Sequence, residues 1–430
     1  LTLRYCNAWR LCKNINDMNV EIIVIGDELL IGQVTDTNSS WIARNLNKIG
    51  WEVMEITTVR DRRAEIISAI RQSFDRVDVV LMTGGLGPTK DDITKQTLCE
   101  YFGGKLIFDA EVQKNNDLFF ERRGLQMNDS TRTQAMVPDS CTVIQNPVGT
   151  APIMWFEKDG KVLVSMPGVP AEMQRAMTAE VLPRLRKRYP DHTAILHKTC
   201  LVKDFSESAL SEFLSDFEAG LPASIKLAYL PVPGVIRLRL TARGENEEIL
   251  SRQLDDSFSR LEDLLGKHIF CHRDATMAEA LGLLLSYKGL TIATAESCTG
   301  GNIAHEITLI PGSSAYYKGS VVSYANEVKV QVLDVDPSTI EKHGVVSCEV
   351  VEQMAKGVRR LLKTDCAIAT SGIAGPDGAV PGKPVGTVCI AVAVGDRIVS
   401  RKYCFENSRA ININRFTHTA LLQMISVLSE

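Results

Sequence analysis

Several features are missing from this sequence of 430 residues. It has no apolar run near the roughly 18 residues that a membrane-spanning helix needs, so no membrane association is expected. Its eleven cysteines include no C-x-x-C pair, which argues against a zinc site or a disulfide framework and favours reduced thiols in the cytoplasm. Neither sign of charge is in large excess, since the net charge is -4. No nucleic-acid partner is therefore expected.

What is present is an ordinary globular composition, with 45% hydrophobic and 23% charged residues. The length allows two or three domains, each with its own core. Met18 directly precedes a clean strand pattern, so residues 1–18 are expected to be a disordered or non-native extension. The sequence predicts two α/β sandwich domains joined by a small α+β domain, with these bounds: 19–185, 190–267 and 274–430.

The first of these domains alternates apolar runs with helical patterns. Strands are predicted over residues 20–26 and 77–82, with helices over 38–48 and 64–74 between them. Apolar runs of this length between helices imply a mostly parallel sheet that is covered on both faces. Ligands in such folds bind at the carboxyl ends of the strands.

A glycine-rich segment, TGGLGPTKDDIT at residues 83–94, follows the strand over 77–82. Its backbone N–H groups can surround phosphate oxygens, and its two aspartates can supply hard oxygen ligands to a divalent metal. The alternative is that Asp91 or Asp92 only caps the helix that begins there. The predicted phosphate-binding residues are Thr83, Gly84, Gly85, Gly87 and Thr89.

This segment, with GDELL at residues 26–30 and PGVPAEM at 167–173, resembles the molybdopterin-binding fold of molybdenum-cofactor biosynthesis proteins. In this form it is similar to the amino-terminal domain of the CinA family, whose name records competence and damage induction. The resemblance implies a metal-dependent ADP-ribose pyrophosphatase. The alternative is a non-catalytic regulatory module that binds a pterin or a nucleotide. The residues that the resemblance assigns to the divalent metal are Asp27, Asp91, Asp92 and Glu172.

The middle domain, residues 190–267, offers no convergent acid, base or nucleophile. The basic run at 184–188 before it is read as a solvated helix C-terminus, which the helix dipole favours, rather than as an RNA contact. The domain is predicted to be structural or interfacial. Because a middle domain between two enzymatic units often mediates pairing, a homodimer is expected.

The last domain is organised around AESCTGG at residues 295–301. An apolar, β-branched run precedes this segment and a helical pattern follows it, so Ser297 and Cys298 are predicted on a sharp strand-to-helix turn. A serine and a cysteine, two nucleophile types, thus lie beside the backbone N–H groups of Thr299, Gly300 and Gly301, which are predicted to be free to bind an anion. This combination suggests a catalytic site. The alternative is a tight turn in which the glycines only allow close packing.

A serine nucleophile needs a base, and the sequence offers no histidine for it in a turn motif of this domain. The G-x-S-x-G elbow is also absent, which excludes a standard hydrolase triad. Lys329 is the better base, because it falls in the first turn of a helix that Asn326 is predicted to cap, where the dipole should lower its pKa. Tyr324 could relay the proton. The alternatives are a solvated Lys329 with a packed Tyr324, and Cys298 as the nucleophile.

AESCTGG, GSVVSYANEVK at 319–329, SGIAGPDG at 371–378 and KPVGTV at 383–388 are similar to the carboxy-terminal domain of the CinA family. With the amino-terminal motifs, the resemblance covers residues 19–430. It implies a nicotinamide-nucleotide amidase that acts in NAD salvage, also called the pyridine nucleotide cycle. Such an enzyme hydrolyses nicotinamide mononucleotide (NMN) to nicotinic acid mononucleotide and ammonia without a cofactor. The nucleophile would be Ser297, with Tyr324 and Lys329 handling protons. The implied substrate-binding residues are Thr299, Gly300, Gly301, Ser371, Gly372 and Arg409.

Overall fold

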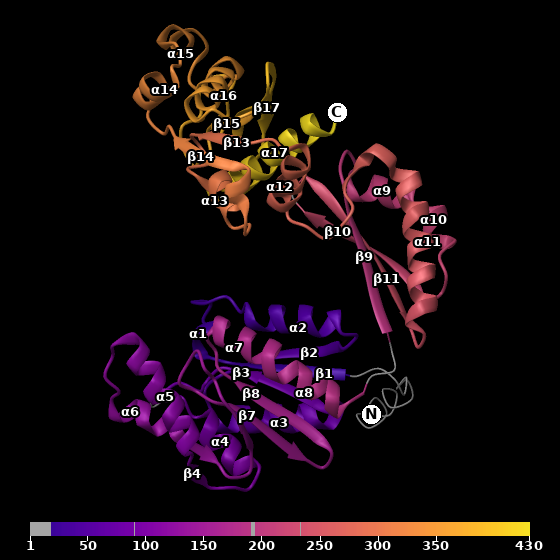
Figure 1. Ribbon diagram of the computed structural model, residues 1–430, viewed down its shortest axis with the longest axis vertical. Coiled ribbons are helices and arrows are strands. Elements are labelled where there is room, and N and C mark those ends of the chain that lie inside the picture. Colours follow the sequence, from indigo (N-terminus) through magenta and orange to yellow (C-terminus); the bar gives the residue numbers. More distant parts are fainter. Residues whose placement is uncertain (1–18, 90, 191–193, 233) are drawn as a thin grey trace. The chain divides into compact units, whose positions relative to one another are not determined.

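The computed structural model describes residues 19–430, apart from residues 90, 191–193 and 233. The extension expected over residues 1–18 lies outside the described residues. The described chain divides into two compact units, one made of residues up to 196 with 243–250, the other of 197–242 with 251–430 (Figure 1). Both units combine sheets with covering helices, and the predicted α/β fold class is confirmed. No helix of the described chain is long and apolar enough to cross a membrane.

A six-stranded sheet forms the centre of the first unit. Its strands are, in spatial order, β2 (Glu52–Val59), β1 (Asn19–Ile25), β3 (Val79–Thr83), β8 (Lys161–Met166), β7 (Ile153–Lys158) and β6 (Thr142–Ile144). The first four are mutually parallel, and β7 is antiparallel to both of its neighbours. Every residue of β3 is buried, as a parallel strand with both faces covered requires. A separate ribbon pairs β4 (Leu106–Phe108) with β5 (Met136–Pro138).

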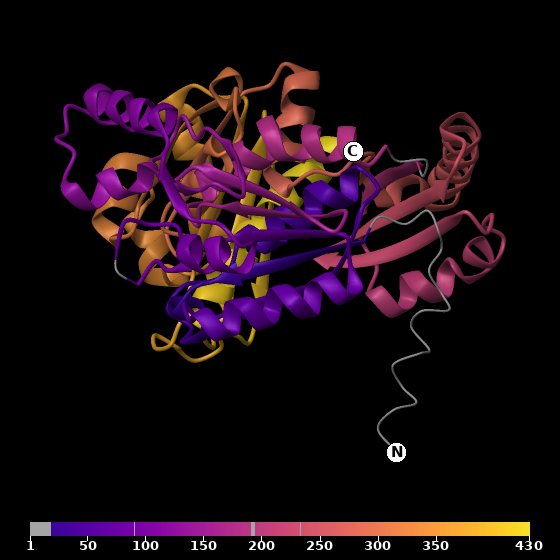
Figure 2. The ribbon, with the colours of Figure 1, turned by 90° about the horizontal axis from the view of Figure 1, so that it is seen from below.

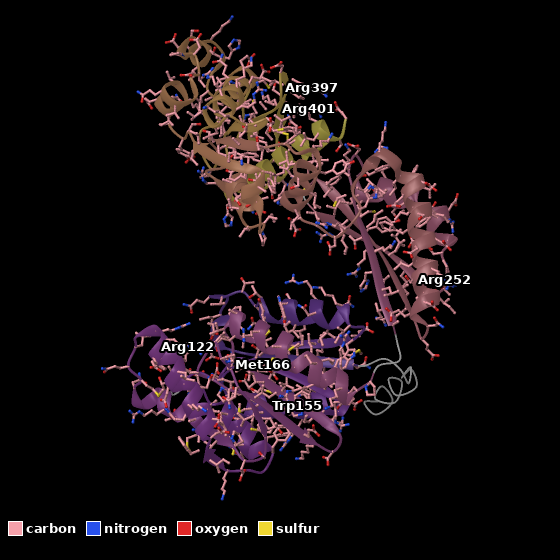
Figure 3. All side chains as sticks on the ribbon, in the orientation of Figure 1. Arg122, Trp155, Met166, Arg252, Arg397 and Arg401 are labelled. Carbon is pink, nitrogen blue, oxygen red and sulfur yellow. The ribbon has the colours of Figure 1, made fainter. Side chains whose placement is uncertain are left out.

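Helices cover both faces of this sheet (Figures 1 and 2). One face carries α2 (Asn38–Lys48) and the continuous run of α7 (Pro170–Ala176), the π-helical η3 (Met177–Val181) and α8 (Leu182–Arg188). The other carries α3 (Arg63–Arg76) and α4 (Thr94–Tyr101). Ile22 packs into the first cluster and Ile23 into the second, because successive strand side chains point to opposite faces. Trp155 and Met166 belong to the first cluster (Figure 3). The remaining helices are α1 (Asp27–Leu30), α5 (Ala110–Arg123), α6 (Asp129–Arg132) and η2 (Thr133–Ala135).

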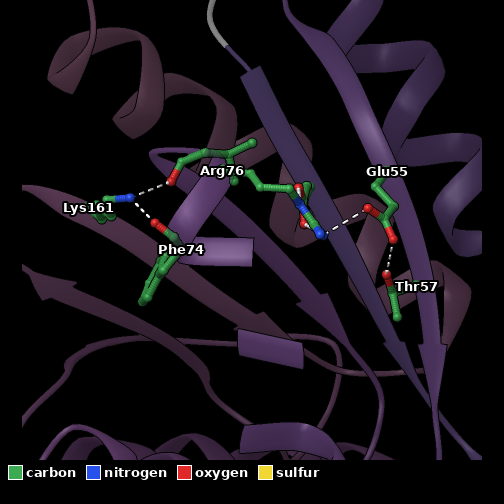
Figure 4. Close-up of polar contacts among 7 residues, drawn as sticks. Glu55, Thr57, Phe74, Arg76 and Lys161 are labelled. Carbon is green, nitrogen blue, oxygen red and sulfur yellow. Dashed lines mark hydrogen bonds and ion pairs between the residues drawn. The ribbon is translucent and has the colours of Figure 1, made fainter. Parts of the chain in front are cut away.

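A buried carboxylate ties the end of α3 to the sheet. Glu21 on β1 is only 1% exposed. It accepts two hydrogen bonds from the Arg76 guanidinium, at 2.6 Å from Nε and 2.8 Å from Nη2. The same Nη2 lies 2.8 Å from Glu55 on β2, and the Lys161 ammonium nearby donates to the Phe74 carbonyl (Figure 4). The hydrogen bond to Glu21 raises the pKa of Arg76, so the guanidinium stays charged.

Replacing Arg76 with methionine is expected to lower the free energy of unfolding of the first unit by about 2 kcal/mol, because Glu21 would remain buried without its cation. This loss of stability is smaller than the loss expected when a fully buried ion pair is broken, because the arginine side chain is 45% exposed. All four tryptophans lie within the first 155 residues, so tryptophan fluorescence during urea unfolding reports on this part of the chain. The double variant Glu21→Met with Arg76→Met should recover most of the loss. Equal destabilisation of both variants would contradict the ion-pair argument.

The middle of the chain forms a four-stranded sheet. Its spatial order is β10 (Ile225–Val232), β11 (Val235–Gly244), β9 (Ala194–Val202) and β12 (Ile269–Cys271). The pairs β10–β11 and β9–β12 are antiparallel. The accompanying helices are α9 (Glu207–Phe213), α10 (Ser215–Ala219), α11 (Glu247–Leu265) and η4 (Gly266–His268). The long α11 buries Leu254, Phe258 and Leu261 on one side, which makes it amphipathic.

The end of the chain folds around a five-stranded sheet. Its order is β14 (Tyr317–Val322), β13 (Ile292–Glu296), β15 (Cys366–Gly372), β16 (Thr387–Val394) and β17 (Arg397–Cys404). β13 is parallel to both neighbours, whereas β16 and β17 are antiparallel additions. One face carries α12 (Met277–Lys288), α13 (Asn302–Thr308) and α17 (Arg409–Ser429). The other carries α16 (Cys348–Leu362). Shorter helices are α14 (Asn326–Leu333), α15 (Pro337–His343) and η5 (Ser313–Ala315).

Candidate active site

The residues predicted to carry chemistry in the last domain meet where β13 and β15 end. A cavity of about 190 Å³ opens at this edge of the sheet. Ser297 directly follows β13, and Ser371 and Gly372 are the last residues of β15. Of the predicted residues, the cavity is lined by Ser297, Cys298, Tyr324, Lys329, Ser371, Gly372 and Arg409. Parallel strands end at one edge of a sheet, so residues far apart in the sequence converge here.

Lys329 is buried beside the serine. Only 1% of it is exposed, although it is a lysine. Its Nζ lies 3.2 Å from Ser297 Oγ, and it donates to the carbonyls of Ser323 at 2.6 Å and Tyr324 at 3.4 Å. Burial lowers the pKa of Lys329 below its usual 10.5, because these hydrogen-bond partners are neutral. The direction agrees with the sequence argument, but burial rather than the helix dipole is the leading cause.

Cys298 lines the same cavity as its neighbour Ser297, but it is buried against the core. It is 6% exposed and packs in the apolar cluster that contains Val388. Burial raises the pKa of the Cys298 thiol to about 12, so the thiol stays protonated at neutral pH. A Cβ at Gly372 would come within 3.0 Å of its Sγ, which shows how closely β15 covers the sulfur. Of the two adjacent nucleophile types, Ser297 is the one with a hydrogen-bonded base.

The carboxylate of Glu296 is fully buried at the end of β13, and it holds the turn that carries Ser297. It accepts hydrogen bonds from the backbone N–H groups of Gly301, Ile303 and Ala304, at 3.0, 3.0 and 2.9 Å. The Thr299 hydroxyl also donates to it, at 2.8 Å. The Glu296 side chain therefore satisfies the backbone N–H groups at the start of α13.

This arrangement corrects the expectation that the Gly300 and Gly301 amides are free to bind a substrate. The Gly301 N–H is bonded to Glu296, and the Gly300 N–H donates to the Ser297 carbonyl at 3.1 Å. Thr299 is 3% exposed and its hydroxyl faces Glu296. The physical reason is that a buried carboxylate satisfies the orphan donors of a helix start better than solvent or a ligand does. Ser371 and Gly372 are the predicted substrate-binding alternatives that line the cavity.

Tyr324 and Arg409 stand together at the cavity. The Tyr324 side chain is largely exposed, and its hydroxyl accepts a hydrogen bond from Arg409 Nη2 at 3.1 Å. Arg409 Nη1 donates to the Gly375 carbonyl at 2.7 Å, which fixes the guanidinium. Tyr324 meets Lys329 through its backbone carbonyl. Among the described residues the Tyr324 hydroxyl is hydrogen-bonded to Arg409 and not to Ser297 or Lys329, and the proton relay stays a prediction.

The sequence analysis did not assign Glu296 or Asn326 to the site. Asn326 was predicted to cap α14, but Ala325 is the N-cap residue and Asn326 lines the cavity. The segment before α16 also contributes a wall, formed by Val345 and Val346. A signal for Glu296 was available, since a charged residue at the end of a wholly apolar strand requires buried partners.

In the first unit, the glycine loop after β3 is held tightly. A Cβ at Gly84 would lie 2.1 Å from the Ile25 carbonyl, and φ there is 110°, so only glycine fits. The Thr83 hydroxyl is buried, accepts from Asn38 Nδ2 at 3.1 Å and donates to the Pro167 carbonyl at 2.9 Å. These bonds join the two loops that the sequence analysis selected.

Asp92 closes the same loop on itself. It accepts from the N–H groups of Gly87 at 2.7 Å and Thr89 at 3.0 Å, and from the Thr89 hydroxyl. The alternative prediction was that Asp91 or Asp92 only caps a helix. Asp92 does accept backbone N–H groups as a cap would, but these belong to the loop and not to α4, whose N-cap residue is Ile93. The Gly87 and Thr89 amides were predicted to bind phosphate, and in this structure Asp92 occupies them. Gly85, also predicted there, adopts φ 63° beside Asp61 and Thr94.

The predicted metal ligands are not gathered in one place. Asp27 and Asp92 share a neighbourhood with Asp61, an aspartate after β2 that the sequence analysis did not select. Burial raises the pKa of Asp61, and the charges of Glu28, Asp27 and Asp92 add to that rise. In the part of the chain that the structure describes, no group of three or more His, Cys, Asp or Glu side chains is placed to hold a metal ion.

The other two predicted ligands, Glu172 and Asp91, are not among the charges that act on Asp61. Glu172 accepts a hydrogen bond from Asn146 Nδ2 at 2.7 Å, and burial raises its pKa. Asp91 is exposed on the loop. The set of four therefore does not form a ready coordination shell.

Three family descriptions match successive parts of the chain. Residues 21–187 match "Probable molybdopterin binding domain", 197–271 match "Damage-inducible protein CinA KH domain", and 274–428 match "CinA C-terminal domain". Fold and motifs thus define a protein with a molybdopterin-binding-like domain at one end and a Ser–Lys cavity at the other. A CinA-like protein of Flavobacterium psychrophilum is 47% identical over 94% of this chain and 97% of its own length. The chain belongs to the CinA family.

The chain is similar to further proteins. A CinA-like protein of Cytophaga hutchinsonii is 42% identical, over 94% of this chain and 96% of its own length. Among solved structures, a CinA superfamily protein from Klebsiella pneumoniae is 32% identical, with a TM-score of 0.35, and the match covers 35% of this chain and 95% of that chain.

The KH match bears on the expectation that the protein has no nucleic-acid partner. KH domains clamp the nucleic-acid backbone with a G-x-x-G loop. Within residues 197–271 the glycines are Gly220, Gly234, Gly244 and Gly266, and no two of them have this spacing. The middle domain therefore lacks the sequence element through which KH domains hold RNA, and the absence of a nucleic-acid partner stays our prediction.

Proposed function

We propose that this protein is an amidohydrolase that converts NMN and water to nicotinic acid mononucleotide and ammonia, a reaction of pyridine-nucleotide salvage. The observation that carries the proposal is the 3.2 Å contact between Lys329 Nζ and Ser297 Oγ in a cavity at the sheet edge. A buried lysine with a lowered pKa next to a serine hydroxyl is an activated nucleophile with its base. The motif resemblance to the deamidases of the family supplies the substrate.

In the proposed mechanism, neutral Lys329 takes the proton of Ser297 as Oγ attacks the carboxamide carbon of NMN. The resulting ammonium of Lys329 then protonates the amide nitrogen as its bond to carbon breaks, so that ammonia leaves and an ester of Ser297 remains. Water attacks this ester with Lys329 again as the base, and Oγ regains its proton when the acid is released. The protein's own groups supply every proton transfer, so the proposal needs no metal in this domain.

The remaining groups of the cavity are suited to binding. Asn326, Ser371 and Gly372 lie beside Ser297 and are the candidates for donating hydrogen bonds to the oxyanion. Arg409 presents a fixed guanidinium, which recognises phosphate oxygens in a bidentate manner. We assign it to the phosphate of the mononucleotide, with Tyr324 orienting it.

The test is ammonia release from NMN by the purified protein, with and without EDTA, for the wild type, Ser297→Ala and Cys298→Ala. We expect release by the wild type and by Cys298→Ala, in both conditions, and none by a folded Ser297→Ala protein. If only Cys298→Ala loses ammonia release, Cys298 and not Ser297 is the nucleophile. No release from well-folded wild type would refute the deamidase proposal.

We propose a second activity for the first unit, the hydrolysis of ADP-ribose with a divalent cation. Besides the motif resemblance, what favours it is the gathering of Asp27, Glu28, Asp61 and Asp92 around the glycine loop, at the carboxyl ends of parallel strands. Because the described carboxylates do not form a group of three at a metal-binding position, we derive no step through the cation and assign no ligand set.

This second activity predicts a loss of turnover in one acidic variant and not in its control. Asp61→Asn should lower AMP release from ADP-ribose in the presence of Mg²⁺ or Mn²⁺ by about 10²-fold, because its carboxylate lies within the acidic neighbourhood. Asp75→Asn, at an exposed position of α3 outside the predicted site, should retain the wild-type rate. If the wild type binds a nucleotide in equilibrium dialysis but never turns it over, the first unit is the regulatory binding module instead. The homodimer and the cytoplasmic location stay predictions, which light scattering and fractionation would test.

A further inference from the structure

Two cysteine thiols lie in contact behind the wall of the cavity. Cys348 is the first residue of α16, Cys389 lies on β16, and the two side chains are hydrogen-bond partners. Both belong to the apolar cluster between α16 and the sheet. The proposed deamidation uses neither of them. A pair of thiols on two different elements is the arrangement from which a disulfide can form.

The two thiols differ in how they meet solvent. Cys389 is 1% exposed, and burial raises its pKa to about 12. Cys348 is partly exposed. The ammonium groups of Lys383 and Lys402 lie near enough to Cys389 to oppose the rise of its pKa. A small oxidant therefore reaches Cys348 first, and Cys389 is positioned to react with the product.

The pair is connected to the cavity from both sides. Val345 and Val346, which line the cavity, precede Cys348 by three and two residues in the sequence. Ser371, another lining residue, is the direct cross-strand partner of Cys389, and its hydroxyl donates to the Val345 carbonyl at 2.8 Å. A change in the position of either sulfur is thus passed to the residues beside Ser297.

We propose that Cys348 and Cys389 are an oxidative modification site, at which a hydroperoxide converts the two thiols into a disulfide that slows the deamidase. The regulatory part of this inference rests on the proposed function of the cavity. Cys348 attacks one peroxide oxygen, the O–O bond breaks, and sulfenic acid and water form. The Cys389 sulfur then displaces the hydroxyl from the Cys348 sulfur as a second water. Two thiols are oxidised, one hydrogen peroxide is reduced to two waters, and a dithiol reverses the reaction.

The disulfide must alter the wall, because its sulfurs are only about 2 Å apart and those of a hydrogen-bonded pair are farther apart. The first turn of α16 is drawn toward β16, together with the preceding Val345 and Val346. A displacement of about 1 Å near reacting groups can cost on the order of 10²-fold in rate. We expect the oxidised protein to deamidate NMN at least about tenfold more slowly than the reduced protein.

The experiment treats the reduced full-length protein with hydrogen peroxide, blocks remaining thiols, and maps linked peptides by mass spectrometry without reduction. Ammonia release is measured before oxidation, after it and after dithiothreitol. We expect a Cys348–Cys389 peptide whose yield follows the loss of rate, and recovery with the dithiol. Cys348→Ser and Cys389→Ala should keep their rates in peroxide. Cys404→Ser, which removes an exposed cysteine outside the pair, should remain as sensitive as the wild type.

Two outcomes would overturn the inference. One is the absence of the linked peptide at peroxide concentrations that already oxidise Cys404. The other is a linked peptide with an unchanged rate. If the reduced wild type releases no ammonia at all, the proposed function fails separately. The site is then judged by the linked peptide and by amide hydrogen exchange over residues 343–347, which should slow on oxidation if the disulfide constrains the wall and stay unchanged if it does not.

Discussion

Replacing Lys329 with methionine is expected to lower the rate of ammonia release from NMN by about 10³-fold or more, because the change removes the base and keeps a side chain of similar length. The amine is the group within 3.2 Å of the serine hydroxyl, and it is fully buried. Lys342→Met is the matched control, since Lys342 is an exposed lysine of the nearby α15, and it should keep the wild-type rate.

The pH dependence of the wild type provides a second readout of the same group. Lys329 acts as a base only when it is neutral, so the rate should rise as pH passes through its pKa and level off above it. Burial lowers this pKa, so the midpoint must lie below the 10.5 of an ordinary lysine. Measuring the rate of ammonia release across the alkaline pH range tests where this midpoint lies. A Lys329→Met variant with most of its activity and an unchanged profile would contradict the role as base.

The local parts of this site could be predicted from the sequence. The strand before Ser297, the turn at 295–301 and the helix that carries Lys329 all follow from hydrophobic periodicity and turn residues, which act over a few neighbours. The distance between Ser297 and Lys329 depends in addition on the parallel pairing of β13 with β14, which the structure supplies. Periodicity likewise predicted α2 over residues 38–48, with the same bounds as found.

The contacts that the sequence could not predict depend on tertiary packing. The Tyr324 hydroxyl meets Arg409 across 85 positions of sequence, and nothing near Tyr324 indicates that partner. Asp61 follows β2, and it comes close to Asp27 because β2 lies next to β1 in the sheet. This strand order is a tertiary feature that the local sequence does not specify. The reversed strand β7 lies between β8 and β6 in a sheet that is otherwise parallel, and its direction is a matter of pairing rather than of local pattern.

Glu296 is the residue whose replacement should show how the turn is held. Its carboxylate accepts from three backbone N–H groups and from the Thr299 hydroxyl, all within 3.0 Å. Glutamine at this position keeps the shape, but it turns an NH₂ group toward donors and leaves buried N–H groups without an acceptor. Glu296→Gln is therefore expected to lower the free energy of unfolding of the second unit by about 3 kcal/mol. Thermal unfolding followed by circular dichroism would measure it.

The same substitution should also reduce deamidation, by about 10²-fold, at temperatures where the variant remains folded. Ser297 immediately follows Glu296, so a turn that loses its anchor lets the hydroxyl drift from the amine of Lys329. Because the substrate contacts are unchanged, kcat should fall while KM for NMN stays near the wild-type value. Glu341→Gln, at an exposed position of α15, is the control for carboxylate loss. A folded Glu296→Gln protein with full kcat would show that the carboxylate stabilises the start of α13 without positioning the nucleophile.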